Sequence, residues 1–334
     1  MVRREVAPSG RPPAVRMNID FTRLSRWLAS LGNFVARQFF QARGALIARL
    51  PLAAIAPVAA TAWSIRALFD PGSRSRGAER LEFANSIIGG APSDRCSVAT
   101  TGLRERLIDQ RIYFGRLLRG GEAWPDLQAV ANELAGQIRR LQAASPGKPI
   151  FVSPFHYVSQ YANIYVIDEL RALLGLASIA VVSGVPRDMY GEDHAQIPGV
   201  QVLYTYGEDN RNGLGLRLAR ALKRSGVAVL FADVPPFALH RFPMETIGVS
   251  MFGRAARIHN GVFRLGAQFE ASLLPFYLGF ERGRFRGELL PPISLTQPAA
   301  PQLLAQYIEK ALTDNCRHSL VVGHPSMYAF AASK

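Results

Sequence analysis

Short apolar runs alternate with helix-length segments through the second half of this 334-residue chain. Five runs have the length and composition of buried strands, at residues 149–153, 179–182, 200–204, 227–231 and 273–280. Helical patterns lie between them, at 156–174, 214–225 and 257–265. Because the runs are uniformly apolar rather than alternating, they are typical of parallel strands buried on both sides. The pattern therefore predicts an α/β fold, with helices on both faces of a mostly parallel sheet.

Two apolar segments precede this region. Residues 24–35 place Leu, Trp, Phe and Val on one helical face, and residues 26–41 place arginines and polar residues on the other. Such a helix can lie in a membrane interface, or it can pack against the rest of the protein. Residues 50–65 are uncharged, but they include two prolines and fall short of the roughly 20 residues that span a bilayer. They predict a re-entrant, interfacial or buried helix.

The stretch at 71–77 is rich in Pro, Gly and Ser and predicts a loop between two parts of the chain. We expect residues 1–75 to contain a basic, disordered lead followed by membrane-associating helices. Residues 76–334 are expected to form the α/β domain. Met17 is an alternative start, because a helical pattern opens directly after it.

The formal net charge of +14 favours an anionic partner: phospholipid, an acidic carrier protein or nucleic acid. Nucleic acid is disfavoured, because the arginines are spread along the chain without zinc-finger spacing or RNP-like aromatic motifs. The two cysteines do not form a disulfide framework, and a reducing compartment is the default. No His, Cys or acidic residues recur at metal-binding intervals. The sequence has no Gly-x-Ser-x-Gly elbow, P-loop or complete dinucleotide fingerprint.

Candidate functional residues follow the predicted strands, where sites in such sheets gather. His156 can act as a general base for a hydroxyl nucleophile, or it can be a structural histidine. Arg187 follows the second strand and can hold a phosphate or carboxylate, or it can be an ordinary surface residue. Asp233 follows the fourth strand, where a structural role is favoured. Gly253 would allow a ligand close to the backbone, and Arg254 would add a second anion contact.

In order, these blocks resemble the lysophospholipid acyltransferase superfamily, specifically the lauroyl/myristoyl (late) acyltransferases of lipid A biosynthesis. The resemblance covers roughly residues 80–325 and rests on the ordered set rather than on any single motif. The matching blocks are the family's His-x4-Asp/Glu at His156–Tyr161, its Arg-bearing loop at Val185–Arg187, its strand ending in Asp at Val227–Asp233, its Phe-Gly-Arg-x-Ala at Phe252–Ala256, and its final strands from Gly283 to Ile293.

The resemblance implies an acyltransferase on the cytoplasmic face of the inner membrane, held there peripherally or by a shallow anchor. It would move a fatty acyl chain from an acyl-carrier-protein or coenzyme A thioester to a hydroxyl or amine of a lipid or glycolipid. The thioester is a co-substrate, and no metal or bound cofactor is implied. His156 would be the base, with Arg187 and Arg254 on phosphates, Asp233, Phe252 and Gly253 lining the substrate site, and sheet-edge donors stabilising the oxyanion.

Tyr161 stands where the family motif has its acid. The acid fixes the tautomer of the imidazole and stabilises the imidazolium that forms, whereas a neutral phenol can only orient the ring. Three interpretations stay open. His156 and Tyr161 can form a weaker dyad, or another group such as Asp233 or Asp168 can supply the charge. Alternatively, catalysis is lost and the fold serves as a lipid-binding or scaffolding partner.

Overall fold

The structure is a computed structural model that describes residues 38, 40–86, 88, 95–119, 122–183, 199–204, 213–236, 245–322 and 328. Residues 46–334 form one compact unit. The predicted interfacial helix at 24–35 lies outside the described residues, as does the Arg187 loop. The described residues include the strands of the sheet and His156, so their positions can be followed in detail.

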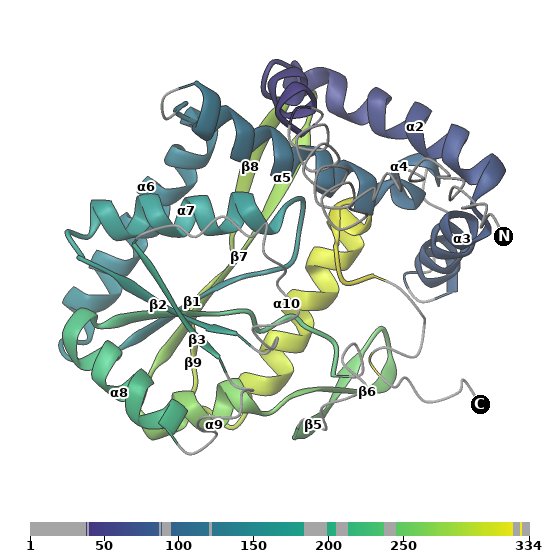
Figure 1. The fold of residues 1–334 in the computed structure, drawn as a ribbon. Helices are drawn as coiled ribbons and strands as arrows, with labels where there is room; N and C mark the ends of the chain where they lie inside the picture. The colour runs from purple at the N-terminus through teal and green to yellow at the C-terminus, as the bar shows by residue number, and fades with distance from the viewer. Residues whose placement is uncertain are drawn as a thin grey trace, which may run out of the picture. The chain divides into compact units, whose positions relative to one another are not determined.

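A seven-stranded sheet organises this unit, with the order β3-β2-β4-β1-β7-β8 (Figure 1). The short strand β9 pairs with the first residues of β7, and β8 pairs with its later residues. Neighbouring strands among β1, β2, β3, β4 and β7 are parallel, whereas β8 and β9 run antiparallel to β7. The strands are β1 (Ile150–Pro154), β2 (Ile179–Ser183), β3 (Val200–Tyr204), β4 (Val227–Leu230), β7 (Ser272–Glu281), β8 (Arg284–Leu289) and β9 (Ile293–Ser294). The predicted α/β class and mostly parallel sheet are confirmed.

Helices cover both faces of the sheet (Figure 1). One face carries α6 (Pro125–Ala144) and α7 (Gln160–Leu173), and the other carries α8 (Leu214–Ser225) and α9 (Gly261–Gln268). All five residues of β1 are buried, and so are all four of β4, because both strands have helices above and below them. Uniformly apolar strands are the consequence expected of such burial.

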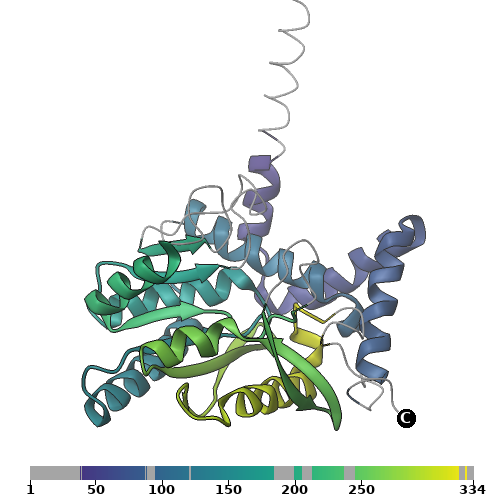
Figure 2. The same cartoon turned by 90° about the horizontal axis from the view of Figure 1, so that it is seen from below.

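Two further helical groups complete the described fold. Before the sheet come a 3-10 turn at Leu52–Ala54 and the helices α2 (Ile55–Phe69), α3 (Pro71–Ser86), α4 (Arg95–Ala99) and α5 (Thr101–Leu118). After it, α10 (Ala300–Asn315) packs against the hairpin of β5 (Thr246–Met251) and β6 (Arg254–His259). The hairpin, in green, and α10, in yellow-green, lie side by side in both Figure 1 and Figure 2.

The helix α2 buries only a narrow stripe, made by Ile55, Ala59 and Ala67. Several of its other apolar side chains are exposed, and Leu68 and Phe69 are 70% and 83% exposed. By length and composition, the segment Leu52–Phe69 could cross a membrane. It extends four residues beyond the apolar stretch identified in the sequence.

The loop predicted at 71–77 is wrong, because these residues form the first turns of α3. Asp70 caps the helix: its Oδ1 accepts the N–H of Gly72 at 3.0 Å, and its Oδ2 accepts the Ser73 hydroxyl at 2.6 Å. Pro71 occupies the first helical position, where its fixed φ favours a helix and its missing N–H costs nothing. The helix passes without a break through the predicted boundary at residue 75.

The helix predicted at 257–265 is partly wrong, because residues 254–259 form β6 and the helix begins at Gly261. Ala256 and Ile258 are buried while Ala255 and Arg257 face solvent, which is the two-residue period of a strand. Phe252 and Gly253 form the hairpin turn, with φ of 52° and 69°. Two consecutive positive φ values define the tight hairpin turn that favours glycine.

Candidate functional site

His156 and Asp233 meet at the carboxyl edge of the sheet. His156 lies two residues after β1, and Asp233 lies three residues after β4. Because β1 and β4 are parallel neighbours, with Val152 opposite Val229, their carboxyl ends emerge side by side. Sites in open parallel sheets form at this edge.

The Asp233 carboxylate binds His156 through both of its oxygens. Oδ1 lies 2.8 Å from the ring Nδ1, and Oδ2 accepts the backbone N–H of His156 at 2.6 Å. The Asp233 side chain is 1% exposed, whereas that of His156 is 12% exposed. Because a carboxylate accepts hydrogen bonds, this contact favours the neutral tautomer with its proton on Nδ1 and its lone pair on Nε2. The pair therefore presents an imidazole in a fixed orientation.

Asp233, rather than Tyr161, is the partner of His156. Tyr161 lies in the first turn of α7, where its backbone N–H donates to Asp109 Oδ1 at 3.3 Å and its ring packs edge-on against Tyr113. No hydrogen bond between Tyr161 and His156 is found in the described part of the chain. Asp168 is engaged elsewhere, with Arg171. Asp233, favoured above for a structural role but also kept open as a source of charge for the ring, is the carboxylate that contacts His156.

Backbone contacts with a C-terminal segment fix the loop that carries His156. The His156 carbonyl accepts the N–H of Leu320 at 2.7 Å, and the Val158 N–H donates to His318 O at 2.8 Å. Val158 has φ of 66°, a left-handed conformation that is costly for a β-branched residue. Such strain costs on the order of 1–3 kcal/mol and clusters at functional sites, where the surrounding contacts impose it.

Two arginines, the half-buried Arg80 and the buried Arg104, hold this C-terminal segment in place. Arg80 donates from Nη1 to Ser319 O at 3.0 Å and from Nη2 to Leu320 O at 3.2 Å. Arg104 donates to the Arg317 carbonyl and to Ser97 Oγ. The two guanidinium groups therefore connect α3 and α5 to the C-terminal segment, whose backbone holds the loop that carries His156.

Two acidic residues near the site escaped the sequence analysis. Glu105 and Asp109 share one face of α5, and burial together with the Asp109 charge raises the pKa of Glu105 to about 7. The charges of Arg80, His156 and Arg106 act in the opposite direction. Asp109 Oδ1 accepts from the Ser159 hydroxyl, which in turn caps α7 by accepting the Ala162 N–H. The four-residue spacing was visible in the sequence, but the packing of α5 beside His156 was not.

The predicted Phe252-Gly253-Arg254 block lies at the tip of the β5–β6 hairpin. The Phe252 N–H donates to Glu309 Oε2 at 2.8 Å, and Arg254 Nη2 reaches the Ser86 carbonyl at 3.5 Å. No hydrogen bond or ion pair among the described residues joins this block to His156. Nor do the described residues include a cluster of three or more His, Cys, Asp or Glu side chains able to hold a metal ion.

Fold and site together define an α/β protein with a buried aspartate oriented on a partly exposed histidine at the carboxyl edge of a parallel sheet. No model of a known protein family matches the chain, and no curated protein sequence matches it either.

Proposed function

We propose that this protein is an acyltransferase that moves a fatty acyl chain from a thioester to a hydroxyl or amine of a lipid or glycolipid acceptor. The observation that carries the proposal is the 2.8 Å contact between His156 Nδ1 and Asp233 Oδ1. It leaves Nε2 free to accept a proton, which is the requirement for activating a hydroxyl near neutral pH. The order of sequence blocks that resembles the lipid A acyltransferases supplies the reaction class.

In the proposed reaction, His156 Nε2 removes the proton of the acceptor hydroxyl as its oxygen attacks the thioester carbonyl. The tetrahedral oxyanion then collapses, the carbon–sulfur bond breaks, and the imidazolium returns its proton to the departing thiolate. The products are an ester and a free thiol. Asp233 holds the ring in one tautomer and stabilises the imidazolium between the two proton transfers. Asp233 therefore offsets the loss of the motif acid at Tyr161.

The surface chemistry supports action at an anionic membrane. The exposed side chains of Leu68 and Phe69 extend the apolar face of α2, and Leu118 is exposed beside Arg49 and Arg119 at a surface hollow. Arginines beside apolar side chains favour interfaces with anionic lipid. The net charge of +14 also favours an acidic carrier protein as the donor. We therefore place the reaction at the inner-membrane surface, with acyl carrier protein or coenzyme A as the carrier.

Thiol release from a panel of acyl carrier protein and coenzyme A thioesters, with and without cell lipid extract, tests the proposal. We expect lipid-dependent release by the wild type and its loss in His156→Gln. His259→Gln is the matched control, because His259 lies on β6 and makes no described contact with the pair. Release that survives in His156→Gln would refute the assigned mechanism. A folded, lipid-binding wild type without release would favour a lipid-binding or scaffolding role instead.

A further inference from the structure

Basic side chains cover the outward face of α8. Arg217, Arg220, Lys223 and Arg224 are all exposed, and α8 contains no acidic residue. Spacings of three and four residues place these side chains next to one another on the helix surface. From Arg217 to Arg224 the helix rises by roughly 10 Å, which is the length of the row that the four cations form. We call these four residues the α8 row.

The charge of the α8 row is not neutralised within the described part of the chain. None of its members forms an ion pair there, and Arg217 Nη2 reaches the Tyr204 carbonyl at 3.4 Å. The helix dipole stabilises Lys223 and Arg224, which lie in the last turn, but not Arg217 and Arg220. Because like charges at these spacings repel one another, the stability of the helix does not explain the row.

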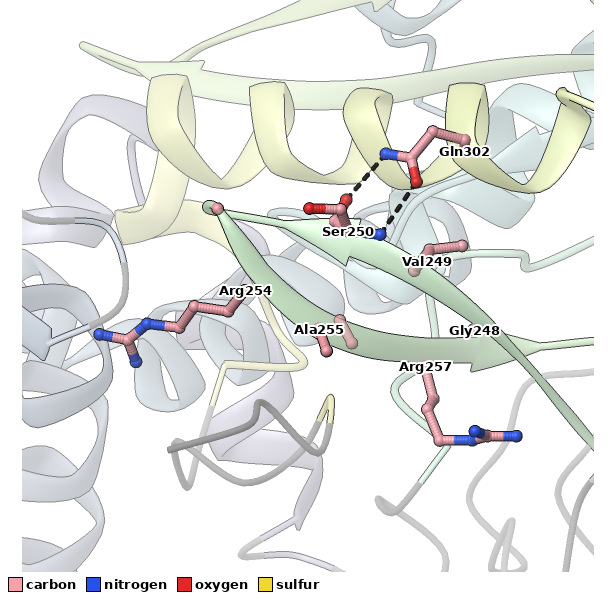
Figure 3. A pocket seen from close by; sticks show the side chains of 9 residues that line it. Gly248, Val249, Ser250, Arg254, Ala255, Arg257 and Gln302 are labelled. Atoms are coloured by element: carbon pink, nitrogen blue, oxygen red, sulfur yellow. Dashed lines mark hydrogen bonds between the residues drawn. The ribbon is translucent and has the colours of Figure 1, made fainter. Parts of the chain in front are cut away.

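The exposed arginines of the β5–β6 hairpin are arranged differently. In Figure 3, the side chains of Arg254 and Arg257 extend from β6 in different directions. Arg254 Nη2 reaches the Ser86 carbonyl, whereas Arg257 donates to Thr246. The hairpin therefore does not gather its charge into one row, as α8 does.

The α8 row begins at the edge of the sheet that carries His156. Arg217 contacts Tyr204 at the carboxyl end of β3, and β3, β2, β4 and β1 are parallel neighbours in that order. With about 4.8 Å between neighbouring strands, β3 lies roughly 14 Å from β1. In Figure 1 and Figure 2, α8 lies on a different side of the described unit from the apolar helix α2. A partner at α8 therefore lies beside the site edge and leaves α2 uncovered.

We propose that the α8 row is the docking surface for an acidic carrier protein, which brings the acyl thioester to His156. This inference rests on the proposed acyl transfer and makes the donor a protein-borne thioester. Carboxylates spaced along a helix of the carrier match cations spaced three and four residues apart on α8. Complementary charges of this kind speed the encounter of two proteins and fix their register. A carrier protein holds its thioester on a flexible arm, which covers the distance from α8 to the site edge.

Other anionic surfaces match α8 less well. A helix in a membrane interface presents large apolar side chains beside its cations, but Leu218 and Leu222 are buried in the core and only Leu216 is exposed. The helix also lacks aromatic side chains on which the bases of nucleic acid stack. A second copy of the chain carries the same net charge of +14 and is repelled.

Binding is measured first, without turnover. Isothermal titration of the full chain with the thiol form of acyl carrier protein compares the wild type with Arg220→Glu/Arg224→Glu. The matched control is Arg139→Glu/Arg140→Glu on α6, which changes the net charge equally on the other face of the sheet. Arg220→Lys/Arg224→Lys keeps the charge of the α8 row, and circular dichroism verifies that each variant is folded. Anionic vesicles and duplex DNA are titrated in the same way.

Thiol release then separates docking from chemistry. With the acyl carrier protein thioester, Arg220→Glu/Arg224→Glu should raise KM at least tenfold and leave kcat within threefold, because docking contributes equally before and during the reaction. With an acyl-pantetheine thioester, which is too small to reach α8 from the site, the variant and the wild type should release thiol at equal rates.

We expect the α8 glutamate variant to weaken carrier binding at least tenfold, and the α6 and lysine variants to weaken it less than threefold. Equal effects of the two glutamate variants would overturn the docking surface, because binding would then follow net charge alone. No carrier binding by the wild type, or a larger loss of vesicle or DNA binding than of carrier binding in the α8 variant, would overturn it as well. Carrier binding that depends on α8, without release from any thioester, would support the docking surface and refute the acyl transfer.

Discussion

The carboxylate of Asp233 binds both the backbone N–H and the ring Nδ1 of His156. Two contacts from one buried side chain fix the ring and the loop together. The orientation of the imidazole is therefore held by Asp233 as well as by the rotamer preference of His156. Asparagine at this position would keep the size of the side chain but lose the charge. Its neutral amide could also donate to Nδ1 and so favour the wrong tautomer, with the ring proton on Nε2.

We therefore expect Asp233→Asn to lower kcat by about 10⁴-fold, as found when a catalytic triad loses its aspartate. The substrate KM should change little, because Asp233 is buried behind the ring. Asp314→Asn, on the exposed end of α10, is the control. A kcat within threefold of wild type for Asp233→Asn would contradict the assigned role.

Tyr161→Phe should leave kcat within about threefold of wild type. The phenol makes no described contact with His156, and the contact of Tyr161 with Asp109 uses the backbone N–H, which the substitution retains. Steady-state thiol release checks this directly. A loss as large as that of Asp233→Asn would mean that the phenol acts in catalysis.

Glu105 makes the stability of the protein depend on pH. Its pKa rises from 4.5 to about 7 on folding, so between these values the folded state binds more proton than the unfolded state. Stability therefore falls as pH rises through this window, by about 3 kcal/mol in all. In Glu105→Gln this loss should be absent. Urea unfolding at pH 4.5 and pH 8 measures this change in stability, with the exposed Glu133→Gln as control. The same pH dependence in Glu105→Gln and wild type would refute the assignment of the loss to Glu105.

Arg80→Lys should destabilise the fold by about 1–3 kcal/mol. An ammonium cannot donate to the Ser319 and Leu320 carbonyls in the fork geometry of the guanidinium, and a buried carbonyl without a partner is costly. The strained backbone at Val158 depends on the same segment, so kcat should also fall. Chemical denaturation and thiol release test both effects. The exposed Arg106→Lys should change neither the stability nor kcat. Equal stability of the two variants would argue that Arg80 does not hold the C-terminal segment in place.

Leu68→Ser/Phe69→Ser should weaken sedimentation with anionic vesicles at least tenfold, because burying a large apolar side chain contributes roughly 1.5–3 kcal/mol. Both side chains are exposed, so the free energy of unfolding in solution should stay the same. Leu216→Ser, at an exposed position of α8, is the control for a loss of apolar surface elsewhere. Undiminished vesicle binding in the α2 variant would exclude this end of α2 from the membrane contact.

The sheet could be predicted because burial on both faces makes each parallel strand uniformly apolar, as in β1 and β4. Local composition misled at 71–77, where an N-capping aspartate and a proline start a helix that glycine and serine alone would not suggest. It misled again at 254–259, where exposed Ala255 and Arg257 alternate with buried Ala256 and Ile258 over too few residues to indicate a strand.

His156 could be predicted from its place after a strand, but the sequence left its partner open among Tyr161, Asp233 and Asp168. Asp233 is 77 residues away in the sequence, and it reaches the ring only because β4 lies next to β1 in the sheet. The local motif drew attention to Tyr161, five residues away, whose side chain lies on α7 and contacts Tyr113. Strand order, which sequence periodicity does not report, decided between them.

Mass spectrometry of the lipid product tests directly whether acyl transfer depends on His156. Purified protein is incubated with an isotope-labelled acyl thioester and cell lipid extract. We expect a lipid or glycolipid to gain the labelled acyl group with the wild type and with His259→Gln, but not with His156→Gln. Labelled product formed equally by His156→Gln, or intact thioester and unchanged lipids with folded wild-type protein, would contradict it.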